Sequence, residues 1–196
     1  MQRFRETFPE LVGKRIIDIG GYPWFWVEHQ TDARITVVNL HTPDFDLSRH
    51  PNIEFVEGDG CDLNYPDGLF DISFSNSVIE HLGTWEKQMR FASEARRVSR
   101  SLWIQTPAKE FFFEPHFLTP FIHWLPKDTR KGLAKHFTTW GLITRPSQEE
   151  VNLFVDEIRL LTFGEMSALF PECIVQREQI LGCTKCYIAV NANNGF

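Results

Sequence analysis

The feature of this sequence that most constrains its fold is an alternation of short apolar segments with helical ones. Apolar segments that are rich in β-branched residues and bounded by turn residues predict buried strands. Such segments are 14–19, 34–40, 53–56, 69–75 and 102–106. Segments that predict helices are 4–11, 24–29 and 84–98. The alternation predicts an α/β fold with a parallel sheet, helices on both faces and the carboxyl ends of the strands at one edge.

The alternation stops after residue 107, where an aromatic and basic segment begins. Its aromatic residues are Phe111, Phe112, Phe113, Phe117, Phe121, Trp124, Phe137 and Trp140. Between 115 and 145 its basic residues are Lys127, Arg130, Lys131, Lys135 and Arg145, and its acid is Asp128. We expect a helical insert or lid at about 108–150, which either closes over an apolar ligand or packs for stability. The basic residues either steer an anionic ligand or partner, or form a solvated helix face.

Two capping boxes and a hairpin are predicted near the end of the chain. Ser147-Gln148-Glu149-Glu150 and Thr162-Phe163-Gly164-Glu165 are capping-box sequences, and the second begins a helix to about residue 170. Segments 174–180 and 185–190 predict strands, and Leu181-Gly182 between them is short enough for an antiparallel hairpin. The length of 196 residues favours one domain over 1–196, since a domain typically has roughly 150 residues.

Charge and hydropathy argue against several classes of protein. The formal net charge is -6, whereas a general nucleic-acid-binding protein needs a cationic face, so we expect no such binding. No apolar run approaches the roughly 18–20 residues that span a bilayer, and the N-terminal residues lack the apolar core of a signal peptide. We therefore expect a cytoplasmic protein without a membrane span. The sequence predicts no particular oligomeric state.

The cysteines and histidines offer no complete set of metal ligands at a familiar spacing. Cys183 and Cys186 have C-x-x-C spacing, but neither a second pair nor nearby histidines follow them. We expect all the cysteines to be reduced packing residues: Cys61, Cys173, Cys183 and Cys186. His116 and His123 lack a third ligand at a useful spacing. We therefore expect no metal ion.

The turns that follow the predicted strands carry glycines and polar residues in a definite order. Asp18-Ile19-Gly20-Gly21 ends the first strand, Asn39 lies near the end of the second, Asp59 follows the third, and residues 76–82 follow the fourth. In this order and spacing, residues 14–107 resemble the class I S-adenosylmethionine (SAM)-dependent methyltransferases, especially the small type 11 methyltransferase domain. The resemblance implies a doubly wound, mostly parallel, seven-stranded Rossmann-like sheet with an antiparallel last strand. It also implies SAM as cofactor and S-adenosylhomocysteine (SAH) as product.

The resemblance assigns cofactor-binding roles to the residues that match the family's motifs. A glycine turn after the first strand lets backbone N–H groups approach a ligand closely, and in the family it holds the amino-acid end of SAM. The other matched turns lie at the ribose, the adenine and the methyl donor. The cofactor-binding candidates are Asp18, Gly20, Gly21, Tyr22, Asn39, Leu40, Asp59, Gly60, Cys61, Asn76, Ser77 and Val78.

Two parts of the motif depart from the family's pattern. Tyr22 and Trp24 stand where further glycines are expected. This predicts either a reshaped pocket with an aromatic ring near the sulfonium or a site that no longer functions. Asn39 replaces the acid that usually binds both ribose hydroxyls. Because an amide lacks the strength of a charged acceptor, we expect weaker SAM binding unless another residue, such as His41, compensates.

The candidate catalytic residues are His81 and His116, both expected on the acceptor side. His81 belongs to a Glu-His-Leu element that recurs in the family, and it either acts as a general base or braces the following helix. The favoured interpretation is a SAM-dependent methyltransferase that acts on a small-molecule acceptor, which the sequence does not identify. The alternatives are an inactive methyltransferase-like binding protein and a Rossmann protein that binds NAD or a nucleotide sugar.

Overall fold

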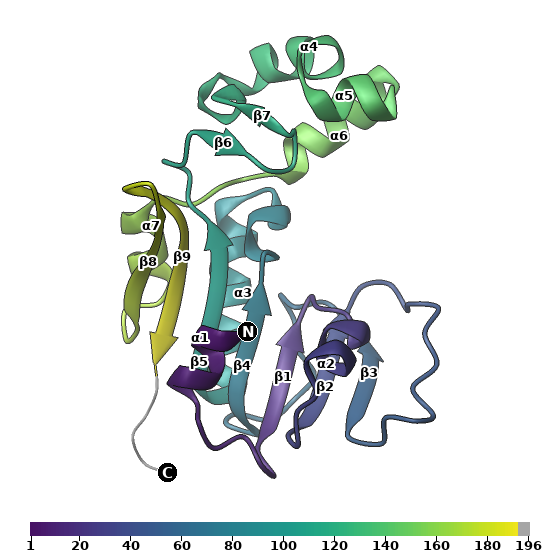
Figure 1. The fold of residues 1–196 in the computed structure, drawn as a ribbon, viewed down its shortest axis with the longest axis vertical. Helices are drawn as coiled ribbons and strands as arrows, with labels where there is room; N and C mark the ends of the chain where they lie inside the picture. The colour runs from purple at the N-terminus through teal and green to yellow at the C-terminus, as the bar shows by residue number, and fades with distance from the viewer. Residues whose placement is uncertain (192–196) are drawn as a thin grey trace.

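A computed structural model describes residues 1–191 and contains a seven-stranded sheet, shown in Figure 1. The strand order is β3-β2-β1-β4-β5-β9-β8. The strands are β1 (Arg15–Ile19), β2 (Arg34–Asn39), β3 (Ile53–Glu57), β4 (Phe70–Asn76), β5 (Ser99–Pro107), β8 (Ile174–Ile180) and β9 (Cys183–Asn191). Residues 192–196, which belong to the predicted domain, lie outside the described residues.

The pairing of the strands confirms the predicted doubly wound, mostly parallel sheet. Strands β1 to β5 pair in parallel, whereas β9 is antiparallel to both of its neighbours, β5 and β8. From β1 the chain continues to β2 and β3 on one side of the sheet, and then returns to β4 and β5 on the other side. The carboxyl ends of β1 and β4 therefore flank the point where the strand order reverses. Open α/β sheets bind ligands at such a point.

Two apolar cores, one on each face, hold helices against the sheet. One core packs α1 (Gln2–Thr7) and α2 (Pro23–His29) with a cluster of buried aromatic rings. Its largest members are Phe4, Trp26, Phe74 and Trp103, whose rings meet edge to face. The other core packs α3 (Trp85–Val98) and α7 (Phe163–Leu169). Part of the aromatic surplus of the sequence therefore fills the core.

An insert between β5 and α7 stands above the carboxyl edge of the sheet (Figure 1). It consists of β6 (Phe113–Glu114), β7 (Thr119–Pro120), the 3₁₀ helix η2 (Ile122–Trp124), α4 (Lys127–Phe137), α5 (Thr139–Thr144) and α6 (Gln148–Glu157). It has its own apolar cluster, which includes Phe117, Val151 and Val155. The insert differs from the predicted one in its short two-stranded ribbon, β6–β7, and in its extension through α6 to Glu157.

Local signals determine several ends of the elements. Both predicted capping boxes are present, with Ser147 and Glu150 at the start of α6 and Thr162 and Glu165 at the start of α7. The predicted hairpin joins β8 to β9. Its turn, Leu181-Gly182, has φ values of 51° and 79°. This left-handed backbone is what a two-residue hairpin turn requires.

The cysteines are free thiols, as expected. Cys186 is buried in β9, and burial raises the pKa of its thiol to about 12. Cys183 is exposed, so the expectation that it is a packing residue is wrong. It is the first residue of β9, directly after the hairpin turn. Among residues 1–191, no helix combines the length and the apolar character needed to cross a membrane.

Candidate functional site

A cavity of about 410 Å³ lies where β1, β2, β3 and β4 end, at the switch point of the sheet. Its volume is within the usual range of small-molecule sites. The residues predicted from the sequence that line it are Gly20, Tyr22, Asn39, Leu40, His41, Asp59, Gly60, Ser77, Val78 and His81. The predicted residues outside its lining are Asp18, Gly21, Cys61, Asn76 and His116. The lining residues that sequence analysis missed are Ile19, Val38, Gly58, Leu82, Phe91 and Glu157.

The glycine turn after β1 packs tightly against the segment that follows β4. Gly20 has a φ of +82°, and a Cβ at this position would overlap the side chain of Val78. A Cβ at Gly21 would overlap the carboxylate of Asp18. Glycine is therefore needed at both positions by the protein's own packing, which brings the turn and Val78 together in one wall of the cavity.

Asp18 supports the glycine turn from inside the protein. Its side chain is 1% exposed, and its Oδ2 accepts a hydrogen bond of 2.7 Å from Trp26 Nε1. Its Oδ1 is buried without a hydrogen-bond partner among the described residues. Burial raises the pKa of Asp18 to about 7, although the hydrogen bond from Trp26 opposes the shift. We interpret Asp18 as a positioning residue, since it does not line the cavity.

Asn39 holds the glycine turn through its side-chain amide. Its Nδ2 donates hydrogen bonds of 3.0 Å to the carbonyl oxygens of Gly20 and Gly21. A carboxylate could not make these bonds, because its oxygens only accept hydrogen bonds. The departure from the usual acid thus has a structural reason. Oδ1 of Asn39 remains an acceptor for a ligand hydroxyl, since it accepts no hydrogen bond from residues 1–191.

Tyr22 and Trp24, which replace glycines of the family motif, form an aromatic pair beside the turn. Their rings stack with centroids 4.2 Å apart and planes 10° apart. Tyr22 lines the cavity, and both rings are more than a third exposed. The pair therefore offers an aromatic surface at this end of the cavity, next to Gly20.

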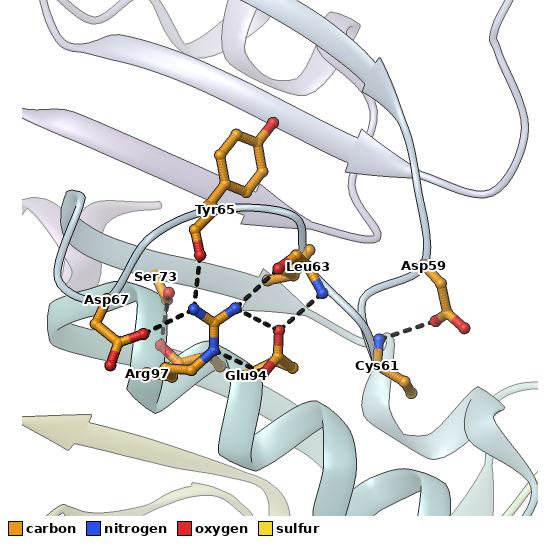
Figure 2. Close-up of polar contacts among 9 residues, drawn as sticks. Asp59, Cys61, Leu63, Tyr65, Asp67, Ser73, Glu94 and Arg97 are labelled. Atoms are coloured by element: carbon orange, nitrogen blue, oxygen red, sulfur yellow. Dashed lines mark hydrogen bonds and ion pairs between the residues drawn. The ribbon is translucent and has the colours of Figure 1, made fainter.

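Asp59 lies in the turn after β3 and lines the cavity. Its Oδ1 accepts a hydrogen bond of 2.8 Å from the backbone N–H of Cys61, which Figure 2 shows. This bond leaves Oδ2 as an acceptor for a ligand. A Cβ at Gly60 would lie 2.6 Å from Ile19 and 3.3 Å from Phe91, so the turn needs glycine to pack here.

The loop after Asp59 is anchored to α3 (Figure 2). The guanidinium of Arg97 donates to Leu63 O, Tyr65 O, Asp67 and Glu94 at 2.6–2.9 Å. Glu94 in turn accepts a hydrogen bond from the backbone N–H of Leu63. Because one planar guanidinium fixes backbone and carboxylate groups together, the loop is held in a defined shape.

Burial raises the pKa of the Cys61 thiol to about 11.

Ser77 and Val78 lead from β4 into η1 (Ile79–Leu82). Ser77 has a left-handed φ of 57°, which is uncommon for a residue other than glycine and is often found at functional sites. Its backbone N–H donates to Gln105 O at 2.9 Å. The neighbouring Asn76 is exposed and outside the lining of the cavity. This strained turn directs the chain past the glycine turn toward His81.

A chain of ionisable side chains begins at His81 and leads away from the cavity. Nε2 of His81 lies 3.1 Å from Nε2 of His116. Nδ1 of His81 lies 3.0 Å from Glu157 Oε1, and Nδ1 of His116 lies 2.6 Å from Glu114 Oε1. Because a carboxylate oxygen accepts, each Nδ1 donates. The two predicted histidines are therefore brought together, although His81 alone of the two lines the cavity.

Burial and neighbouring charges shift the pKa values of these histidines in opposite directions. Burial, together with the nearby His116, lowers the pKa of His81 despite the opposing effect of Glu157. Burial also acts to lower the pKa of His116, but the hydrogen bond and charge of Glu114 outweigh it and raise that pKa above its ordinary value. His123 is separate from the pair, since its Nε2 donates to Lys109 O at 3.0 Å.

Glu80 is buried beside the two histidines. Its side chain is 0% exposed, and its Oε2 accepts a hydrogen bond of 2.9 Å from Thr106 Oγ1. Burial raises its pKa to about 7. The backbone oxygen of Glu80 accepts from Arg159 N at 2.7 Å, and Gln88 Nε2 donates to Arg159 O at 2.8 Å. These bonds tie the segment after the insert to η1 and α3.

Comparison with known proteins finds a family match for the central part of the chain. Residues 20–101 match the family model described as "Methyltransferase domain". This match includes Gly20, Asn39, Asp59 and His81, but it ends before the insert. No curated protein sequence matches the chain significantly.

Solved structures share the fold at low sequence identity. A SAM-dependent methyltransferase from Aquifex aeolicus is 12% identical, with a TM-score of 0.55, over 96% of this chain and 86% of that one. The 1,6-didemethyltoxoflavin-N1-methyltransferase of Burkholderia thailandensis, solved with 1,6-didemethyltoxoflavin and SAH, is 13% identical, with a TM-score of 0.58, over 96% and 73%. A Rhodobacter sphaeroides protein described as a putative Zn-dependent alcohol dehydrogenase is 15% identical, with a TM-score of 0.64, over 96% and 88%. At these identities the likeness shows the fold alone.

Proposed function

We propose, on the premise that residues 20–101 are a class I SAM-dependent methyltransferase domain, that the protein transfers a methyl group from SAM to a small-molecule acceptor. The observation that carries the proposal is the cavity at the switch point, whose wall combines Gly20, Asn39 and Asp59. These residues lie at the carboxyl ends of β1, β2 and β3, which is the order in which the family places its SAM-binding groups.

The residues in the cavity fit the chemistry of SAM. Gly20 and Tyr22 would meet the amino-acid end, Oδ1 of Asn39 a ribose hydroxyl, and Oδ2 of Asp59 the adenine amino group. Gly20 and Gly60 let the two turns pack against Val78 and Ile19, which a Cβ at either position would overlap. When bound, SAM supplies a methyl group that is activated by its sulfonium. We call this part of the cavity the cofactor end.

His81 and Glu157 mark the other part of the cavity, which we call the acceptor end. An acceptor hydroxyl or thiol must lose a proton on methylation. We propose that the pair of His81 and His116 promotes the loss of this proton. The volume of about 410 Å³ must hold the cofactor and the reacting part of the acceptor together, which favours a small molecule. Exclusion of water from this part of the cavity would strengthen the polar contacts between the protein and the acceptor.

The proposed function is tested by thermal unfolding of the protein with saturating SAH, and with NAD as a control. A ligand at about 100 times its Kd stabilises the folded state by roughly 2.7 kcal/mol. For a chain of this length, this should raise the Tm by roughly 5–10 °C. We expect the rise with SAH and none with NAD. A rise with NAD alone, or with neither ligand, would contradict the proposal.

A further inference from the structure

The facing histidines His81 and His116 present an electrostatic conflict when both rings are neutral, and a cation between them, either a proton or a metal ion, resolves it. Each Nδ1 donates its hydrogen to a carboxylate, from His81 to Glu157 at 3.0 Å and from His116 to Glu114 at 2.6 Å. In the neutral rings, both Nε2 atoms then carry a lone pair and no hydrogen. These atoms lie 3.1 Å apart. Two lone pairs at this distance repel each other unless a positive charge lies between them.

Glu80 adds a third group with an unused ligand atom. Its Oε2 accepts a hydrogen bond from Thr106, but its Oε1 is buried without a partner among residues 1–191. A buried carboxylate oxygen without a partner is costly. One ligand atom each from Glu80, His81 and His116 lies within 4.8 Å of the others. The buried Glu80 carboxylate, which has one unpaired oxygen, and the two facing histidines therefore form one cluster.

We propose that Glu80, His81 and His116 bind a divalent transition-metal ion, with zinc as the ion that suits the donors best. Two imidazole nitrogens and one carboxylate oxygen form a common catalytic zinc set, whereas magnesium and calcium prefer oxygen ligands alone. In a tetrahedral zinc site, nitrogens at about 2.05 Å from the metal lie about 3.3 Å from each other. The observed Nε2 separation of 3.1 Å is close to this value.

The surroundings of the two histidines match those of metal ligands. A histidine that binds a metal usually donates its second ring N–H to a carboxylate or carbonyl oxygen, which orients the ring. Glu157 does this for His81 and Glu114 does it for His116. Glu114 is itself fixed, since it is 0% exposed and its Oε2 accepts from the backbone N–H of Phe117 at 2.6 Å. Sequence spacing predicted no metal, because Glu80 and His81 lie far from His116 along the chain.

The site also narrows the chemistry of the acceptor, a step that rests on the proposed function. Three protein ligands leave a position open on zinc. Because His81 lines the cavity, we place that position at the acceptor end. It suits an acceptor whose nucleophile is a hydroxyl or a thiol. The O–H or S–H bond breaks, its proton passes to solvent, and the freed lone pair bonds to the methyl carbon as the carbon–sulfur bond of SAM breaks.

Metal titration of the chelator-treated full chain tests the site independently of activity. We expect one Zn²⁺ per chain by elemental analysis, and one Co²⁺ with the visible absorption bands of a four- or five-coordinate ion. His116→Gln should weaken zinc binding at least 100-fold, because it removes a ligand. Glu80→Gln should also weaken zinc binding, because it replaces a charged ligand with a neutral amide. His136→Gln, an exposed histidine of α4, and Cys183→Ser, an exposed thiol, should bind as the wild type does.

A second variant keeps the test decisive if the buried positions disturb folding. Glu157→Gln changes a half-exposed side chain whose hydrogen bond orients His81, and it should weaken zinc binding 10–100-fold without loss of the fold. No stoichiometric zinc in the wild type, or zinc binding that His116→Gln leaves intact, would overturn the proposal and leave a shared proton as the cation. SAH binding by the wild type is measured separately. Zinc binding without SAH binding would therefore contradict the proposed function alone.

Discussion

At the cofactor end of the cavity, Gly20, Asn39 and Asp59 lie at the carboxyl ends of strands of the sheet. At the acceptor end, His81 comes from η1 and Glu157 from the insert, and His116 of the insert contacts His81 from outside the cavity lining. The cofactor end is held by buried contacts within the sheet edge. The pair of His81 with Glu157 at the acceptor end is partly open to solvent. The sheet therefore determines where the residues of the cofactor end lie, and the packing of the insert determines where the residues of the acceptor end lie.

The largest expected effect is at the glycine turn. Gly20→Ala places a side chain at a φ of +82° and against Val78. The left-handed backbone costs about 1–2 kcal/mol and the overlap about 1–3 kcal/mol, so we expect a loss of about 3–4 kcal/mol in the free energy of unfolding, measured by urea titration. Gly182→Ala is the control, since Gly182 has a φ of +79° in open space. Equal losses in the two variants would contradict the packing of the turn against Val78.

The pH dependence of stability tests the buried support of the turn. Because burial raises the folded pKa of Asp18 to about 7, the folded state holds a proton that the unfolded state has lost. Stability therefore falls as pH rises from about 4 to about 7, and is constant above. At roughly 1.4 kcal/mol per pKa unit, we expect Asp18 to contribute a fall of about 3 kcal/mol between pH 5 and 8. Glu80, whose pKa burial also raises to about 7, adds a fall of the same sign.

Asp18→Asn should remove this part of the pH dependence, since an amide does not titrate in this range. Asp46→Asn, at an exposed position, is the matched control and should keep it. Urea unfolding at pH 5, 6, 7 and 8 measures the slope in all three proteins. A slope that persists unchanged in Asp18→Asn would contradict the role given to burial.

A smaller effect is expected at the amide that holds the turn. Asn39→Asp replaces two hydrogen bonds to Gly20 and Gly21 by a carboxylate that faces their carbonyl oxygens. We expect a loss of about 2 kcal/mol in stability and weaker SAH binding by calorimetry. If Asn39 were only a weakened ribose ligand, an acid here would instead tighten SAH binding.

Asn52→Asp provides the control for this prediction. Nδ2 of Asn52 also donates to two backbone oxygens, those of Thr31 and Ala33, at 2.9 and 3.1 Å. It lies outside the lining of the cavity. This variant should lose a similar amount of stability and keep the SAH affinity of the wild type.

The smallest effect on stability is expected at the acceptor end. Glu157 is about half exposed, and its hydrogen bond to His81 is near solvent. Since partly exposed pairs contribute little, Glu157→Gln should change the free energy of unfolding by less than about 1 kcal/mol. Urea titration beside Asn39→Asp checks this. A loss as large as that of Asn39→Asp would remove the contrast between the two ends.

The elements, and many of the residues that line the cavity at the ends of β1 to β4, could be predicted from the sequence. Strand and helix periodicity, capping boxes and the Leu181-Gly182 turn act locally, so the structure follows them closely. The glycine turn was predicted as a place of close approach, but its neighbours, Val78 and Asp18, were not. The direction of the Asn39 amide could not be predicted either, because spacing places a residue at a strand end without orienting its side chain.

The acceptor end could be predicted only in part. His81 and His116 were both candidates, but their contact depends on how the insert packs above the sheet. Glu157, which lies 76 residues from His81 in the chain, shows no local pattern of a functional residue. Phe91 belongs to the apolar stripe of α3 and could not be distinguished from a residue of the core. Such contacts arise from tertiary packing, which local periodicity does not encode.

Calorimetric titration of SAH tests the central claim, that the cavity at the switch point holds the cofactor, most directly. Asp59→Asn keeps an oxygen that accepts from the backbone N–H of Cys61, but it presents an amide N–H₂ to the adenine amino group. Asp46→Asn is the control, because Asp46 accepts from the backbone N–H of Ser48 in a similar turn outside the cavity lining. We predict one SAH per chain in the wild type, the same affinity in Asp46→Asn, and an affinity about 10-fold or more lower in Asp59→Asn. No binding to the wild type, or equal binding by Asp59→Asn, would contradict the account.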